Sequence, residues 1–90
     1  MLLVVAYDIA DDRRRAKLHT LLLGYGVPVQ ESLFECELDE HDLRRLKQRV
    51  GRLVRPRRDR VSYYALCAGC AARVEDLAGP RPAAPPAYVV

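Results

Sequence analysis

Two stretches of this chain repeat apolar residues at the three- and four-residue spacing of an amphipathic helix, and strand-like runs flank both of them. In the first stretch the repeat consists of Leu18, Leu21, Leu22 and Tyr25. In the second it consists of Leu43, Leu46, Val50, Leu53 and Val54. A chain with two such helices between strands can fold in few ways, because each helix must bury its apolar face on a shared sheet.

The strand-like runs are residues 2–7, 27–38 and 61–67, and a short helix is expected over 68–77. In the middle run the apolar positions switch phase, from Val27 and Val29 to Phe34 and Cys36. A phase switch requires a bulge or a turn, which we place near residues 30–32. The order is then βαββαβ, which predicts an α+β fold, the ferredoxin-like plait.

Local signals set the ends of both helices. Asp11 or Asp12 can cap the first helix, and Gly24 with Gly26 supplies its stop. Asp39 is suited to cap the second helix.

The 90 residues are enough for one domain, which we place at residues 1–78. Residues 79–90 form a tail with four of the six prolines, followed by a strand-like end at Tyr88. That extra C-terminal strand could pair with a sheet edge of its own subunit or be swapped onto a partner's, or it could be a frayed end. A core this small favours a homodimer.

We expect a cytoplasmic protein without a membrane segment. The apolar run at residues 2–7 is too short to cross a bilayer, and no basic stretch precedes it as in a signal peptide.

Asp8 ends the most apolar segment of the chain, and a strand that only fills a core does not need an acid there. The carboxyl end of a strand in a βαβ layout opens toward ligand space. Asp8 could bind Mg²⁺ or Mn²⁺, since magnesium commonly takes one or two carboxylates with water and phosphate oxygens. Two copies of Asp8 could share one ion across a dimer axis. The alternatives are a helix cap and a pair with a nearby arginine.

Basic residues are concentrated in one segment. The net charge is +3, but nine basic residues and one acid, Asp59, lie between positions 44 and 60. Such a segment attracts nucleic acid, or it is a solvated helix face with a basic loop. A second group follows Asp11 and Asp12, where the arginines can hold a phosphate or pair with those acids. The predicted contacts to nucleic acid are Arg13, Arg14, Arg15, Arg55, Arg57, Arg58 and Arg60.

The three cysteines do not form an even disulfide framework. Cys67 and Cys70 have the C-x-x-C spacing of metal and redox sites, but no second ligand pair has the spacing that zinc requires. We therefore expect small buried side chains here, and keep a metal or redox role as a remote alternative. His19 and His41 are single and are expected at the surface.

Three segments together resemble one known family, the small CRISPR-associated adaptation proteins, which are the second member of the universal Cas pair. The segments are AYDIADD with Arg15 behind it, GVPVQESLFE, and DRVSYYALC, spread over residues 2–78. The most specific combination joins Tyr7 and Asp8 to Gln30, Ser32 and Phe34.

The resemblance implies ferredoxin-like homodimers in which Asp8 faces its twin and binds a divalent ion. It also implies one of two activities in spacer acquisition. The first is a metal-dependent endonuclease that acts on single-stranded RNA, duplex DNA or both, with Asp8 as the catalytic residue. The second is a non-catalytic DNA-binding adaptor that bridges two dimers of the CRISPR integrase.

Overall fold

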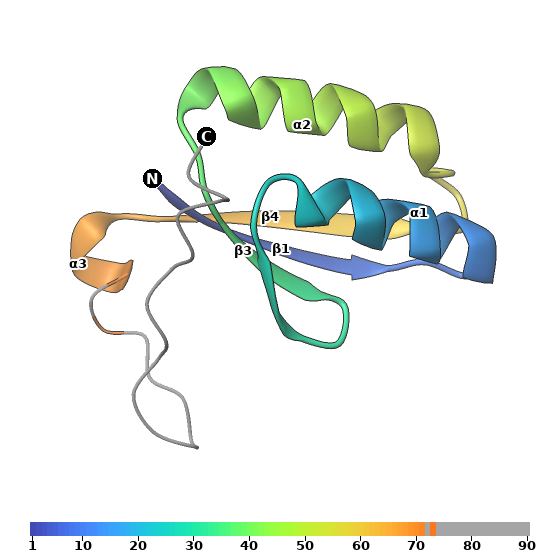
Figure 1. Ribbon diagram of the computed structural model, residues 1–90, viewed down its shortest axis with the longest axis horizontal. Coiled ribbons are helices and arrows are strands. Elements are labelled where there is room, and N and C mark those ends of the chain that lie inside the picture. The colour runs from blue at the N-terminus through green and yellow to red at the C-terminus, as the bar shows by residue number, and fades with distance from the viewer. Residues whose placement is uncertain (72, 74–90) are drawn as a thin grey trace.

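The computed structural model describes residues 1–71 and 73 of the chain. The predicted tail at 79–90, with its strand beginning at Tyr88, lies outside the described residues, as does the end of the predicted helix beyond residue 73. Seven elements follow one another in the order β1, α1, β2, β3, α2, β4 and α3 (Figure 1). Their bounds are Leu2–Asp8, Asp12–Leu23, Val27–Gln30, Leu33–Glu37, Glu40–Leu53, Arg60–Leu66 and Ala68–Ala71.

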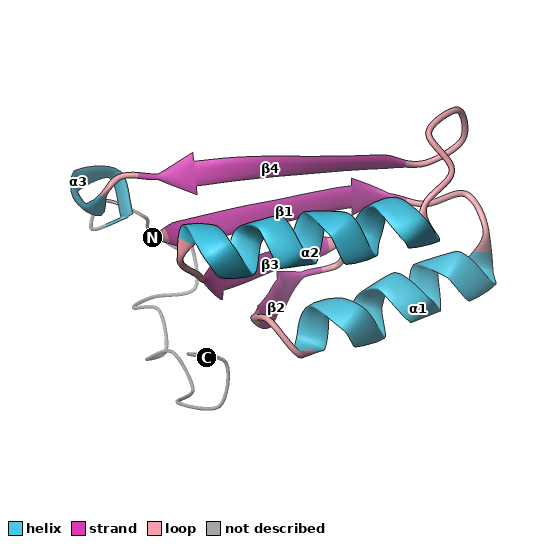
Figure 2. Ribbon diagram, turned by 90° about the horizontal axis from the view of Figure 1, so that it is seen from above, coloured by secondary structure: helices cyan, strands magenta, loops and turns pink. Residues whose placement is uncertain are grey.

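The four strands form one antiparallel sheet in the order β2-β3-β1-β4. This is the βαββαβ arrangement that the sequence predicts, with the two central strands adjacent and antiparallel. Figure 1 shows α1 and α2 on the same face of the sheet, and Figure 2 shows β4 at the edge beyond both helices. The α+β fold class is confirmed.

Alternation along β1 explains how the sheet is covered. Leu3, Val5 and Tyr7 are buried, whereas Leu2 and Val4 between them are only partly buried. Side chains of a strand alternate between the two faces, so the buried set faces the helices. The core consists of Leu3, Val5, Tyr7, Ile9, Leu18, Leu22, Phe34, Cys36, Leu38, Leu46 and Val50.

Both helices begin at the predicted caps. Asp11 accepts a hydrogen bond from the Arg14 amide, and Asp39 accepts one from the Asp42 amide. Each carboxylate satisfies an amide at the start of a helix that has no partner within the helix. Gly24 is the C-terminal cap of α1.

The predicted break in the middle run is present as both a bulge and a turn. The register between β2 and β3 shifts between Pro28 and Gln30, and Ser32 in the following turn has a φ of 62°. The bulge and the two-residue turn together move the apolar set from odd to even positions, so that Phe34 and Cys36 point into the core.

Four strand bounds differ from expectation by one residue. β1 extends through Asp8, β3 ends at Glu37 rather than at residue 38, and β4 covers Arg60–Leu66 rather than residues 61–67. Asp8 and Arg60 are cross-strand partners, so pairing with β1 draws Arg60 into the strand. No helix among residues 1–71 is long and apolar enough to cross a bilayer.

Candidate functional site

Asp8 is exposed at the end of β1. Asp8 has neither of the two alternative roles, a helix cap or a pair with an arginine. Asp11 caps α1, and no ion pair among the described residues includes Asp8. Figure 2 shows the loop after β1 and the loop before β4 at the same end of the molecule. The Asp8 carboxylate is therefore open to an external ligand at that end.

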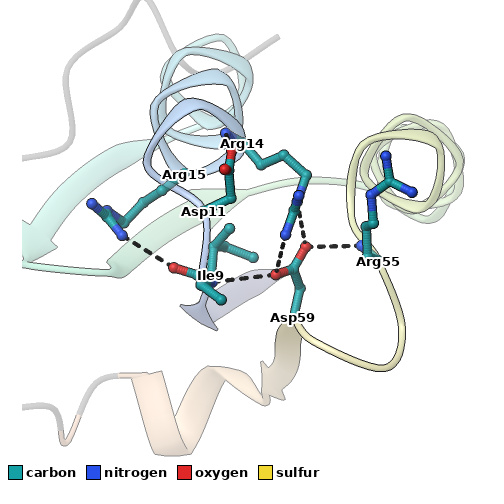
Figure 3. Close-up of polar contacts among 7 residues, drawn as sticks. Ile9, Asp11, Arg14, Arg15, Arg55 and Asp59 are labelled. Carbon is teal, nitrogen blue, oxygen red and sulfur yellow. Dashed lines mark hydrogen bonds and ion pairs between the residues drawn. The ribbon is translucent and has the colours of Figure 1, made fainter.

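A second carboxylate, Asp59, joins these two loops (Figure 3). Its side chain is fully buried. It accepts hydrogen bonds from Arg14 Nε at 2.9 Å, from Arg14 Nη2 at 3.1 Å, from the Arg55 amide at 2.8 Å and from the Ala10 amide at 3.3 Å. The Asp59 carboxylate thus links the β1–α1 loop, the first turn of α1 and the segment before β4.

These contacts determine the charge state of Asp59. The hydrogen bonds from the Arg14 side chain, and then those from the Arg55 and Ala10 amides, lower the pKa of Asp59 from 3.8 to about 2. Burial works in the opposite direction and is outweighed. The same pair raises the pKa of Arg14. Both groups are charged at neutral pH, and the bidentate geometry suits a partly buried pair.

The arginines at 13–15 separate into different environments. Arg14 is engaged by Asp59, a partner that sequence reasoning did not propose. Arg15 donates to the Ile9 carbonyl at 3.1 Å and forms an ion pair with Asp12, which was the alternative to a phosphate contact. Arg13 is exposed. The predicted nucleic-acid contacts of these three residues stay predictions.

Residues 55–60 are the turn before β4 together with the first residue of that strand; we call this segment the basic loop, and it presents arginines to solvent. The turn is closed by the Arg58 and Asp59 amides, which donate to the Arg55 carbonyl at 3.0 and 2.8 Å. Within the loop Asp59 is buried, while the arginine side chains are exposed. No ion pair among the described residues engages the four arginines of the loop, namely Arg55, Arg57, Arg58 and Arg60.

The remaining motif residues have mainly structural surroundings. Tyr7 is buried against Phe34, with ring centroids 6.3 Å apart, and its amide donates to the Ser32 carbonyl at 3.1 Å. His19 is partly exposed, and its ring meets the Phe34 ring edge-on with centroids 5.1 Å apart. Gln30 and Ser32 line a groove of about 450 Å³ that also contains Arg15.

The expectation that Cys67 and Cys70 are buried is wrong, since both are exposed. Small side chains pack well inside a core, but these two residues come after the last residue of the edge strand β4, beyond the end of the sheet. The buried cysteine is Cys36 on β3, where burial raises the pKa of the thiol to about 11.

The donor groups around Asp8 can be compared with those that a bound Mg²⁺ ion requires. Among the described residues no three His, Cys, Asp or Glu side chains come together as a metal cage. A hydrated ion needs less, because one or two carboxylates suffice when water and phosphate oxygens supply the other ligands. The exposed Asp8 carboxylate fits an ion held jointly with a phosphate or with a second copy of the chain.

Comparison with known proteins agrees with this geometry. Residues 1–74 match the family model described as CRISPR associated protein Cas2. The chain is 43% identical over 84 residues to a CRISPR-associated endoribonuclease Cas2 of Chloroflexus aurantiacus, an alignment that covers 91% of this chain and 90% of the relative. It is 48% identical over 82 residues to a CRISPR-associated endonuclease Cas2 of Thermus thermophilus, covering 90% and 87%.

A solved structure extends the comparison to an assembly. One chain of a partial Cas6-RT-Cas1–Cas2 complex superposes with a TM-score of 0.75 at 26% sequence identity. The superposition covers 88% of this chain and 86% of that chain.

Proposed function

The chain belongs to the CRISPR associated protein Cas2 family, and on this premise we propose that it acts in CRISPR spacer acquisition as an endonuclease that binds nucleic acid and hydrolyses its phosphodiester bonds. The observation that carries the proposal is the exposed Asp8 carboxylate at the same end of the fold as the basic loop. Relatives named endoribonuclease and endonuclease support RNA and DNA as candidate substrates.

The residues at this end of the fold have three different roles in the proposed function. Exposed arginines of the basic loop hold phosphates, because guanidinium groups bind phosphate oxygens in a bidentate manner. Asp59 positions the loop beside the end of β1 through Arg14 and the Arg55 amide. Asp8 would hold Mg²⁺ or Mn²⁺. Such an ion, when bound, polarises a phosphodiester and makes a coordinated water a better nucleophile.

A homodimer completes the proposal. Among the described residues, both long helices cover one face of the sheet, and the other face carries Val4, Ala6 and Tyr64. Tyr64 is 55% exposed. The apolar side chains on this uncovered face, which lie beside polar residues such as Glu35 and Ser62, suit a second copy of the chain, which would also supply a second Asp8. Sedimentation at micromolar concentration tests this, and a stable monomer would contradict it.

The alternative function is a non-catalytic adaptor that binds DNA and bridges two dimers of the CRISPR integrase. Two observations favour it. The described residues offer one free carboxylate at the site and no cluster of three potential ligands. A Cas2-like chain also occurs in the partial Cas6-RT-Cas1–Cas2 complex. The adaptor needs the basic surface and the dimer, but no metal.

A single-turnover cleavage assay separates the two functions. Wild type, Asp8→Ala and Glu40→Ala are purified identically and tested on single-stranded RNA and duplex DNA with Mg²⁺, with Mn²⁺ and with a chelator. Glu40 is an exposed acid at the opposite end of the fold and is the matched control. Metal-dependent cleavage that survives Glu40→Ala and disappears in a folded Asp8→Ala supports the nuclease. Binding without cleavage by wild type supports the adaptor, and equal cleavage by all three proteins indicates a contaminant.

A further inference from the structure

Cys67 and Cys70 lie side by side at the end of the sheet that is remote from Asp8. Cys67 follows β4 and precedes α3, and Cys70 lies within α3. β4 runs from Arg60, opposite Asp8, to Leu66, opposite Leu2. The seven residues of the strand therefore separate the cysteines from the candidate site by roughly 20 Å.

The local geometry turns the two side chains toward each other. The Cys70 amide donates a hydrogen bond to Cys67 Sγ at 3.4 Å, so the Cys67 side chain folds over the first turn of α3. Residues three apart on a helical turn have their Cβ atoms about 5–6 Å apart. A disulfide needs roughly 3.5–4.5 Å between them, and a small local adjustment of this short turn supplies the difference.

The three cysteines differ in exposure, and Cys67 and Cys36 differ in the direction in which the pKa of the thiol is shifted. Hydrogen bonds from the Cys70 amide and from the Cys70 thiol lower the pKa of Cys67, and the thiolate is the reactive form of cysteine. Both residues are exposed. Cys36 is buried, and burial raises the pKa of its thiol to about 11.

Zinc does not fit this pair as well as a disulfide does. A structural zinc site requires four ligands, and the described residues contain no third His, Cys, Asp or Glu beside the two cysteines. Two exposed, adjacent thiols with one activated member are instead the arrangement of redox-active dithiols.

We propose that Cys67 and Cys70 are a redox modification site that forms a reversible disulfide within one chain by exchange with a small disulfide such as oxidised glutathione. The Cys67 thiolate attacks one glutathione sulfur, which breaks that S–S bond and releases one glutathione thiolate. Cys70 then loses its proton and attacks the Cys67 sulfur, which releases the second glutathione thiolate. The two cysteines lose two electrons to the glutathione disulfide, and their protons pass to the released thiolates.

The test uses the full-length protein and does not depend on nuclease activity. Reduced protein is equilibrated with mixtures of reduced and oxidised glutathione, quenched with acid, alkylated and analysed by mass spectrometry. We expect two thiols per chain to be lost together, with a peptide cross-link between Cys67 and Cys70. Cys36 should become alkylated only after unfolding, and Cys36→Ala should give the same titration.

Single variants test which thiol attacks. Both cysteines are exposed, so Cys67→Ser and Cys70→Ser should keep the circular dichroism spectrum of wild type. We expect Cys70→Ser to accumulate a mixed disulfide at Cys67, and Cys67→Ser to do so more slowly at Cys70. The proposal is overturned if oxidised wild type carries glutathione on both residues, if it forms cross-links between chains instead, or if both thiols stay free.

Discussion

Replacing the arginines of the basic loop with glutamine should weaken binding to duplex DNA and flatten its dependence on salt. A protein that neutralises phosphates releases counterions, and each contact contributes a slope of about 0.9 to the plot of log affinity against log salt. The loop presents four exposed arginines with no acidic partner among the described residues. If all four contact phosphates, their loss lowers the slope by about 3.6 for each chain engaged.

This slope corresponds to a large and measurable effect. When the salt concentration rises from about 50 to 200 mM, affinity falls by roughly 3.5-fold for each phosphate contact, and by roughly 150-fold for four contacts. Wild-type affinity should therefore fall about 150-fold more over this range than the affinity of the fourfold variant. The substitution Arg55→Gln keeps the backbone amide that donates to Asp59, so the loop should keep its conformation.

A matched pair of double variants separates position from charge. Arg57→Gln with Arg58→Gln removes two adjacent exposed charges from the loop, and Arg44→Gln with Arg45→Gln removes two from the first half of α2. Titrations at three salt concentrations should show a slope reduced by about 1.8 for the loop pair only. Coincident slopes for wild type and the fourfold variant would refute the reasoning, and Arg13 would be the next residue to test.

Two further predictions concern the fold that holds the site. Because the pKa of Asp59 is lowered from 3.8 to about 2, its ionised form stabilises the fold above about pH 4, and this contribution is lost as the pH falls toward 2. Urea unfolding should therefore show that Asp59→Asn is less stable than wild type at pH 7 and that the difference in stability shrinks below pH 4. A difference that stays constant with pH would contradict this prediction. Gly26→Ala should destabilise the fold by about 1–3 kcal/mol, because the new Cβ would collide with the Glu35 carbonyl oxygen. Gly51→Ala in α2, where the new Cβ meets nothing within 4 Å, should instead stabilise the fold by up to about 1 kcal/mol, as urea unfolding would show.

The fold was predictable because its determinants are local. The cap at Asp39 directly precedes the apolar repeat of α2, so a few neighbouring residues are enough to predict where this helix begins. The same holds for the break before Phe34, where a change of phase from odd to even positions requires the bulge and turn that the structure contains. Strand bounds are less local, since Arg60 joins β4 through its pairing with Asp8.

The environment of the site was less predictable because its contacts are distant in sequence. Arg14 and Asp59 are 45 residues apart, and neither shows a local sign of the other. The available signal was compositional, because Asp59 is the only acid among nine basic residues between positions 44 and 60. An isolated acid in such a segment indicates a structural role for its carboxylate. The exposure of Cys67 likewise depends on its position just after the last residue of the edge strand β4, which side-chain size alone does not reveal.

The position of Asp59 also explains how one acid can occupy the basic loop without cancelling its charge. An exposed carboxylate there would pair with neighbouring arginines and lower the positive potential that phosphates meet. Asp59 instead faces inward, where it is neutralised by Arg14 from α1 and by two amides. Asp8 is an exposed acid beside the loop, because it is the cross-strand neighbour of Arg60. A phosphate drawn to the loop arginines would approach Asp8, and the repulsion between the two anions is the physical reason to expect a divalent cation between them.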